Sequence, residues 1–146
     1  MFSIDSNNFP IIIVKLIGNP EPEEDFDNFL NYWLQLYEQE RDFTFYFDTT
    51  EVTTPPLKYC IKMSKFIKEL RQNEIQYLQK SIILINENKI KWMLDFIFWI
   101  QPPVATVYIY HTDNGLTENI SENIETIMNH SETDIVESGK PFLPIF

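Results

Sequence analysis

The stretch Ser81–Gln101, which reads SIILINENKIKWMLDFIFWIQ, decides the fold class of this chain. Its first five residues are small or apolar without alternation, which is typical of a strand buried on both faces. Asn86-Glu87-Asn88 then supplies a loop and a helix cap. The apolar residues that follow predict a helix over 89–101, ended by the prolines at 102 and 103. A buried strand that runs directly into a helix is the repeating unit of α/β proteins.

The same unit recurs on both sides of this stretch. Runs of β-branched and aromatic residues predict further strands at 11–17 (IIIVKLI), 43–47 (FTFYF) and 105–110 (ATVYIY), with a short strand at 2–5 before them. Apolar residues at helical spacing predict further helices over 23–40, 57–71 and 117–129. The inward residues expected on the first two are Phe26, Phe29, Leu30, Trp33 and Tyr37, and Leu57, Cys60, Ile61, Ser64, Ile67 and Leu70.

This alternation predicts the α/β class, as one domain of four successive β-α units over residues 1–130. We expect a mostly parallel sheet of four strands, or five with residues 2–5. Strands 11–17 and 81–85 should be central, and strands 43–47 and 105–110 less buried, because the latter keep polar residues at alternate positions. Residues 131–146 are expected to be a tail without a clear element.

Composition narrows the function classes. The 146 residues carry a net charge of −11, which makes a nucleic-acid binder the least favoured class, because phosphate binding needs a basic surface. One cysteine excludes an internal disulfide framework, and three glycines leave no room for a glycine-rich phosphate loop. We find no signal peptide and no apolar run of about 20 residues, so a cytoplasmic protein is expected. The abundance of Ile and Asn is the bias expected of an AT-rich genome, such as that of a parasite, an amoeba or a large DNA virus.

The lysines gather in the middle of the chain, whereas both ends are acidic. Lys58, Lys62 and Lys65 follow helical spacing and form a basic face. Three interpretations stay open: a solvated outer surface, a docking strip for an acidic protein or an anionic membrane surface, and an internal partner for the acidic first helix.

Helix 89–101 is apolar on more than one face. A helix that covers one face of a sheet needs only an apolar stripe, and Leu94, Ile97 and Phe98 suffice for that contact. The remaining apolar residues must be covered by the C-terminal PFLPIF, by a second copy or another protein, or by a lipid or other apolar ligand. The residues predicted for this interface or ligand site are Trp92, Met93, Phe96, Trp99 and Ile100.

A polar cluster is expected where the strands end, since ligands of parallel sheets bind outside the carboxyl ends of the strands. Its residues are Asp48, Thr49, Thr50, Asn86, His111 and Asp113. A hydrolase would need a nucleophile, a base and an orienting group among them, yet no G-x-S-x-G motif is present, and these residue types are ordinary in loops and caps. We therefore predict no catalytic residue, no metal and no cofactor. Cys60 is expected to be a small core residue.

The order of elements resembles the STAS-like (anti-sigma-factor-antagonist-like) and CRAL-TRIO group of domains over residues 9–129. The resemblance rests on residues 43–48 with their threonine-rich loop, on SIILINENKIKWMLDFIFWI, and on PVATVYIYHTD. STAS domains carry a phosphorylated serine after the second core strand. Here the region reads DTTEVTTPPLKYC, without the glycine of that motif, so the switch is not transferred to Thr53 or Thr54. The resemblance implies a non-catalytic interaction module.

Three functions follow as hypotheses. The first is a protein-interaction module that forms a homodimer through helix 89–101. The second is a carrier or sensor of an apolar ligand or lipid that uses the same helix. The third is a hydrolase at the strand ends.

Overall fold

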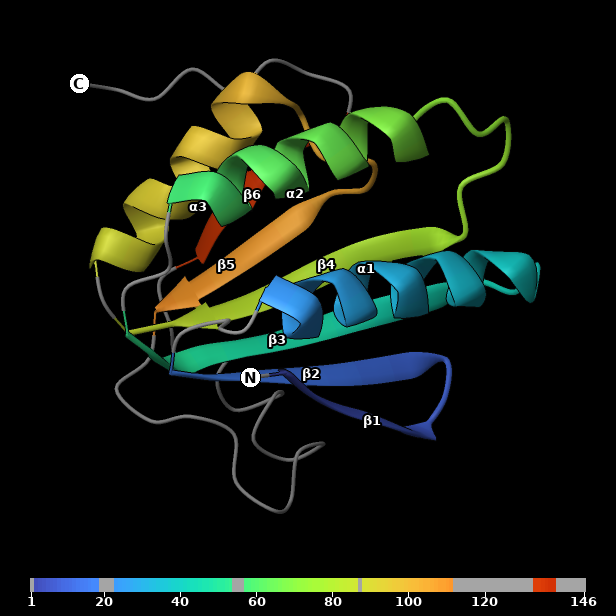
Figure 1. The fold of residues 1–146 in the computed structure, drawn as a ribbon, viewed down its shortest axis with the longest axis horizontal. Coiled ribbons are helices and arrows are strands. Elements are labelled where there is room, and N and C mark those ends of the chain that lie inside the picture. The colour runs from blue at the N-terminus through green and yellow to red at the C-terminus, as the bar shows by residue number, and fades with distance from the viewer. Residues whose placement is uncertain (1, 19–22, 54–56, 87, 112–132, 139–146) are drawn as a thin grey trace.

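The computed structural model describes residues 2–18, 23–53, 57–86, 88–111 and 133–138. They form six strands and three helices in an alternating order (Figure 1). The elements are β1 (Phe2–Asn8), β2 (Ile11–Gly18), α1 (Glu23–Glu38), β3 (Phe43–Val52), α2 (Leu57–Leu70), β4 (Leu78–Ile85), α3 (Asn88–Ile100), β5 (Val107–His111) and β6 (Thr133–Val136).

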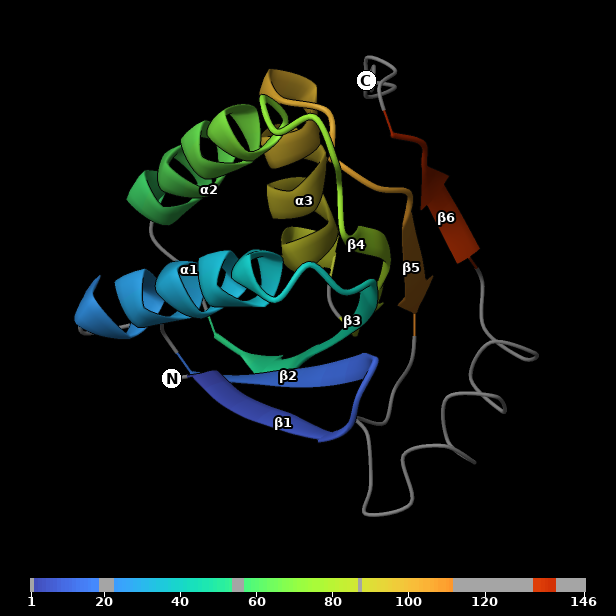
Figure 2. The same ribbon diagram turned by 90° about the vertical axis from the view of Figure 1, so that its right-hand side faces the viewer.

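The six strands lie side by side in the order of the sequence. Strands β2 to β5 are parallel, while β1 pairs antiparallel with β2 and β6 antiparallel with β5. Each crossover between parallel strands carries one helix and moves to the next strand in the same direction. Because such crossovers share one hand, their helices lie on one face of the sheet. Figure 2 shows this, with the sheet curving around α1, α2 and α3.

The α/β class is confirmed, but the four-stranded or five-stranded parallel sheet is wrong. The four strands predicted between residues 11 and 110 are present and parallel, and a strand at each edge makes the sheet six-stranded and mixed. The sequence predicted no element in residues 131–146, yet Thr133–Val136 forms β6. The four residues, Thr-Asp-Ile-Val, do not alternate between polar and apolar and therefore lack the period of two that predicts a strand.

Strand β3 differs most from its prediction. It continues through Asp48–Val52, which the sequence marked as loop, and it lies between β2 and β4 in the middle of the sheet. The strand was wrongly predicted to be less buried, because polar residues occupy its alternate positions. The first half of β3 carries Phe43, Phe45 and Phe47 on the side that faces the helices, and Phe43 and Phe45 are buried there.

The first and third helices present the faces that the sequence predicts. Phe26, Phe29, Trp33 and Tyr37 of α1 are buried, as are Leu94, Ile97 and Phe98 of α3. The prediction for α2 is partly wrong, because Leu57 is 61% exposed and Ile61 42% exposed. Tyr59 and Phe66 are buried instead.

The buried face of α2 is set by its aromatic contacts with α1. The Tyr59 ring centroid lies 5.0 Å from that of Phe26, and the Phe66 centroid lies 5.0 Å from that of Trp33. Because of these contacts, the side of α2 that carries Tyr59 and Phe66 faces inward, and α2 packs against α1 as well as against the sheet.

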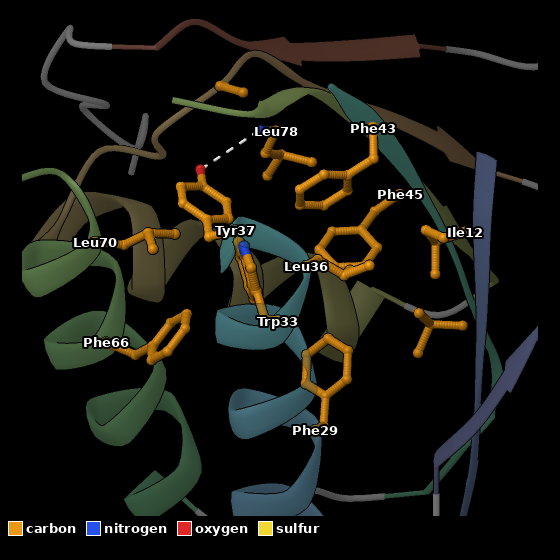
Figure 3. Packing of buried hydrophobic residues seen from close by; sticks show 12 residues of the cluster. Ile12, Phe29, Trp33, Leu36, Tyr37, Phe43, Phe45, Phe66, Leu70 and Leu78 are labelled. Atoms are coloured by element: carbon orange, nitrogen blue, oxygen red, sulfur yellow. Dashed lines mark hydrogen bonds between the residues drawn. The ribbon is translucent and has the colours of Figure 1, made fainter. Parts of the chain in front are cut away.

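The core lies between the helices and the sheet. Figure 3 shows Phe29, Trp33 and Phe45 meeting at its centre, with the Trp33 and Phe45 rings edge to face at 5.0 Å. At one end of this cluster, the backbone N–H of Leu78 donates to the Tyr37 hydroxyl over 3.4 Å, the dashed line in Figure 3.

The opposite face of the sheet holds a smaller apolar cluster, formed by Ile82, Leu84 and Tyr110. Among the residues described, no helix is long and apolar enough to cross a lipid bilayer. The helix predicted over 117–129 and the C-terminal PFLPIF lie outside the described residues.

Candidate functional site

An apolar cavity of about 140 Å³ lies between the three helices and the sheet. Strands β1 to β5 all contribute lining residues, and so does the loop before β5. The helices contribute Phe26, Phe29 and Trp33 from α1, Cys60, Met63 and Ile67 from α2, and Met93, Leu94 and Ile97 from α3.

Small side chains among the cavity walls leave this space open. Cys60 on α2, Ser81 on β4 and Ala105 before β5 all line the cavity, and all three are buried. Large aromatic side chains hold the walls apart, since Phe26 of α1 meets Tyr59 of α2 ring against ring. The cavity is thus a consequence of how α1 and α2 pack over the sheet.

Among the described residues that line the cavity, there is no carboxylate, lysine, arginine or histidine. The Thr49 hydroxyl lines the cavity but donates a hydrogen bond of 2.6 Å to the Leu84 carbonyl, so its polar group is already used. Burial raises the pKa of the Cys60 thiol, which keeps it protonated and unreactive. The described walls are thus almost wholly apolar, which suits an apolar ligand.

The cavity is partly open to the outside, so a small molecule can reach it. Its walls are apolar, and apolar surface left in contact with water is unfavourable. An apolar cavity of roughly 150 Å³ accepts a molecule the size of benzene. A small apolar ligand would therefore recover stability that the empty fold lacks.

Two methionines make the cavity adjustable. Met63 of α2 and Met93 of α3 line it, and both are only partly buried. Methionine has an unbranched, flexible side chain that fills irregular space and repacks readily. The walls on this side can therefore move to admit a chain longer than a single ring.

The α1–α2 contact closes one side of the cavity. Phe26 and Tyr59 both line the cavity and pack against each other. Above them, the Lys62 ammonium forms ion pairs with Glu23, at 2.8 Å, and with Asp27. The hydrogen bonds to Asp27 and Glu23 raise the pKa of Lys62, and the bond from Lys62 lowers the pKa of Glu23. The lysine thus ties the first turns of α1 to α2.

The three lysines of the predicted basic face differ in their surroundings. Lys62 is the internal partner of the acidic first helix, which is one of the three interpretations of the sequence. Lys58 and Lys65 remain exposed on α2. The Lys58 ammonium lies 5.1 Å from the centroid of the Tyr59 ring.

The residues predicted for the interface on α3 separate into two groups. Met93 lines the cavity, and Phe96 packs partly against the core. Trp92 is 76% exposed, Trp99 54% and Ile100 47%. One helix thus presents apolar residues both to the cavity and to the outside.

Part of the predicted strand-end cluster is brought together. Thr50 donates to Asp48 from its backbone N–H and its hydroxyl, at 3.0 and 2.6 Å, and Asn86 donates to the Thr50 carbonyl over 3.1 Å. Asp48 is buried. These hydrogen bonds tie the ends of β3 and β4 together, as expected of capping residues.

His111 does not join this group from the same side of the sheet. Asp48 pairs with Leu84, and Leu84 with Tyr110, so Asp48 and Tyr110 share one face. Side chains alternate along a strand, which places His111 on the other face. Asp113 lies outside the described residues. Within the described ranges, no three His, Cys, Asp or Glu residues are grouped as they would be to hold a metal ion.

Met93 and Thr49 are the candidate site residues predicted from the sequence that line the cavity, but the cavity itself was not predicted. Trp33, Cys60 and Ile97 appear in the sequence as ordinary inward residues of three separate helices. A cavity depends on how closely those helices approach one another, and no local pattern encodes that distance.

Comparison of the chain with protein-family models, curated proteins and solved structures gave no match.

Proposed function

We propose that this protein is a non-catalytic binding module that holds a small apolar ligand in the cavity beneath its three helices. One observation carries the proposal: a space of about 140 Å³ receives lining residues from every described helix, and none of the described residues in its walls is charged. A ligand the size of a substituted benzene ring or a short alkyl chain matches that volume.

The STAS-like or CRAL-TRIO-like relationship belongs to this proposal. It is supported by the alternation of strand and helix from β2 to β5, with four parallel strands in succession. A non-catalytic role is supported further by the hydrogen bonds of Thr49 and Thr50, whose hydroxyls are directed to Leu84 and Asp48 and not to a histidine.

Thermal unfolding in the presence of toluene or 1-hexanol tests the proposal. A ligand that binds only the folded state stabilises it by about 1.4 kcal/mol at ten times its Kd. We expect the midpoint of unfolding to rise with either probe. Native mass spectrometry of protein purified from cells should in addition show a non-covalent adduct of small mass. A midpoint that neither probe shifts, together with an empty protein in the mass spectrum, would contradict the proposal.

A variant that fills the cavity, compared with a matched variant beside it, tests where toluene binds. Ala105→Leu adds three carbons to a side chain that lines the cavity, whereas Thr106→Leu introduces the same side chain one residue along, at a position that does not line it. We expect the first variant to lose the shift with toluene and the second to keep it. Equal shifts in both variants would place the binding of toluene elsewhere.

A further inference from the structure

Exposed apolar side chains are concentrated on two neighbouring helices. Nine large hydrophobic residues are exposed among those described, and five of them lie on α2 and α3. These five are Leu57, Ile61, Trp92, Trp99 and Ile100. Single exposed apolar residues are normal, but a group on one surface marks a site of interaction.

The five residues share the outward side of the α2–α3 pair. The two helices lie side by side in both ribbon views (Figures 1 and 2), and Ser64 Oγ of α2 lies 3.5 Å from the Ile97 carbonyl of α3. Leu57 and Ile61 are one turn apart, and Trp92 and Trp99 two turns apart, so each pair lies on one side of its helix. That side is exposed on both helices, which makes one apolar surface, called here the α2–α3 face.

Lysines surround this face. The two helices contain six lysines and two acidic residues. Lys58, Lys65, Lys68 and Lys89 are exposed, and Lys65 and Lys68 are used in the test below. A chain with a net charge of −11 thus carries its apolar surface within a basic one.

We propose that the α2–α3 face docks on an anionic phospholipid bilayer. Tryptophan is favoured at the boundary between lipid headgroups and hydrocarbon, and lysines beside it extend their ammonium groups to the anionic headgroups. A second copy of the chain fits less well. A two-fold interface places the same patch against itself, so the four lysines would face one another.

The docking surface and the cavity share a helix. Trp92 and Trp99 are exposed on the outside of α3, while Met93 and Ile97 line the cavity from its inside. Apolar molecules are held by membranes and scarcely dissolve in water, so a bilayer is the natural source of the ligand. The inference thus extends the proposed function. Docking would bring the protein to the source of its ligand, and this purpose rests on the proposed ligand site.

Flotation with lipid vesicles tests the docking surface. We expect the wild-type protein to float with vesicles of phosphatidylcholine and phosphatidylserine and to stay behind with phosphatidylcholine alone. The double variant Trp92→Ser/Trp99→Ser should lose flotation. Lys65→Glu/Lys68→Glu should weaken it by well over ten-fold, since each lysine near an anionic surface contributes a factor of about five. Leu34→Ser, at an exposed residue of α1, is the matched control and should float like the wild type.

Three outcomes would overturn the inference. The protein could fail to float with either vesicle, or float equally with both, which would remove the role of the lysines. It could also form a dimer by light scattering without lipid, one that Trp99→Asp dissociates and that does not bind vesicles. The α2–α3 face would then be a homodimer interface.

Toluene-dependent unfolding of the same proteins separates the two proposals. We expect Trp92→Ser/Trp99→Ser to keep the toluene shift and Ala105→Leu to keep flotation. Flotation without any toluene shift in the wild type would contradict the proposed ligand and leave the docking surface standing. A toluene shift without flotation would overturn the docking surface and leave the ligand site standing.

Discussion

Lys62 of α2 lies 2.8 Å from Glu23 of α1 and also pairs with Asp27, directly above the ring contact that closes one side of the cavity. The pair joins residues 39 positions apart in the sequence. It connects the acidic start of the first helix to the basic second helix. Part of the opposite charge on these two helices therefore serves to hold them together.

Replacing Lys62 should change how stability depends on pH. The pKa of Glu23 is lowered from 4.5 by its hydrogen bond to Lys62, so its contribution is present above 4.5 and lost as the pH falls through the lowered value. The pKa of Lys62 is raised from 10.5 by its bonds to Asp27 and Glu23, so its contribution is present below 10.5 and lost at higher pH. We expect the midpoint of thermal unfolding of Lys62→Met to differ most from the wild type between these two values.

Lys65→Met is the control for this measurement. Lys65 is an exposed lysine on the same helix, and its replacement should shift the midpoint by a similar small amount at every pH. A difference between wild type and Lys62→Met that stays constant from acid to alkaline pH would show that the ion pairs do not contribute to stability.

Cys60 should report on the cavity. It is the single cysteine of the chain, it is buried, and burial raises the pKa of its thiol. Alkylation requires an accessible thiolate, so N-ethylmaleimide should react with the folded protein at least ten-fold more slowly than with the protein in urea. Toluene should slow the reaction further, because Cys60 lines the cavity. Mass spectrometry over time measures both rates, and equal rates in buffer and in urea would contradict the buried position.

The two faces of β3 should differ in their contribution to stability. Phe45 is fully buried beneath the helices and contacts the rings of Phe29 and Trp33. Phe45→Ala should lower the free energy of unfolding in urea by about 3–5 kcal/mol. Tyr46→Ala, on the opposite face, should cost clearly less, because Tyr46 is only partly buried. The reverse order would mean that the main core lies on the other side of the sheet.

Strand β6 should contribute to the fold although the sequence marks it as tail. Val136 is buried and packs with Val107 and Ile109 of β5, whereas Ile135 is 56% exposed. Val136→Ala should lower the free energy of unfolding by about 2 kcal/mol, from two lost methyl groups and the space they leave. Ile135→Ala, measured by the same urea titration, should change it little. Equal and negligible effects would show that β6 does not belong to the core.

The sequence predicted the local elements well because their signals are local. The apolar period of residues 26–37 predicts the buried face of α1, and the uninterrupted run of residues 81–85 predicts a strand buried on both sides. The prediction for α2 was less accurate, since Leu57 and Ile61 are as apolar as the residues that are buried. Only the aromatic contacts of Tyr59 and Phe66 with α1 decide which side of α2 faces inward.

The candidate site was predictable only in part. Trp92 and Trp99 stood out in the sequence because one helix carried more apolar residues than a sheet can cover. The cavity gave no such signal, because its walls come from three helices and five strands that meet only in the folded chain.

The sequence by itself determined the α/β class, the parallel run of strands from β2 to β5 and the excess of apolar residues on α3, since these follow from local periodicity and residue type. Tertiary structure alone decided that Thr133–Val136 adds a sixth strand, that Lys62 turns to the acidic first helix, and that the helices and the sheet line an apolar cavity. Each of these depends on distances between segments far apart in the chain, and long-range packing sets those distances.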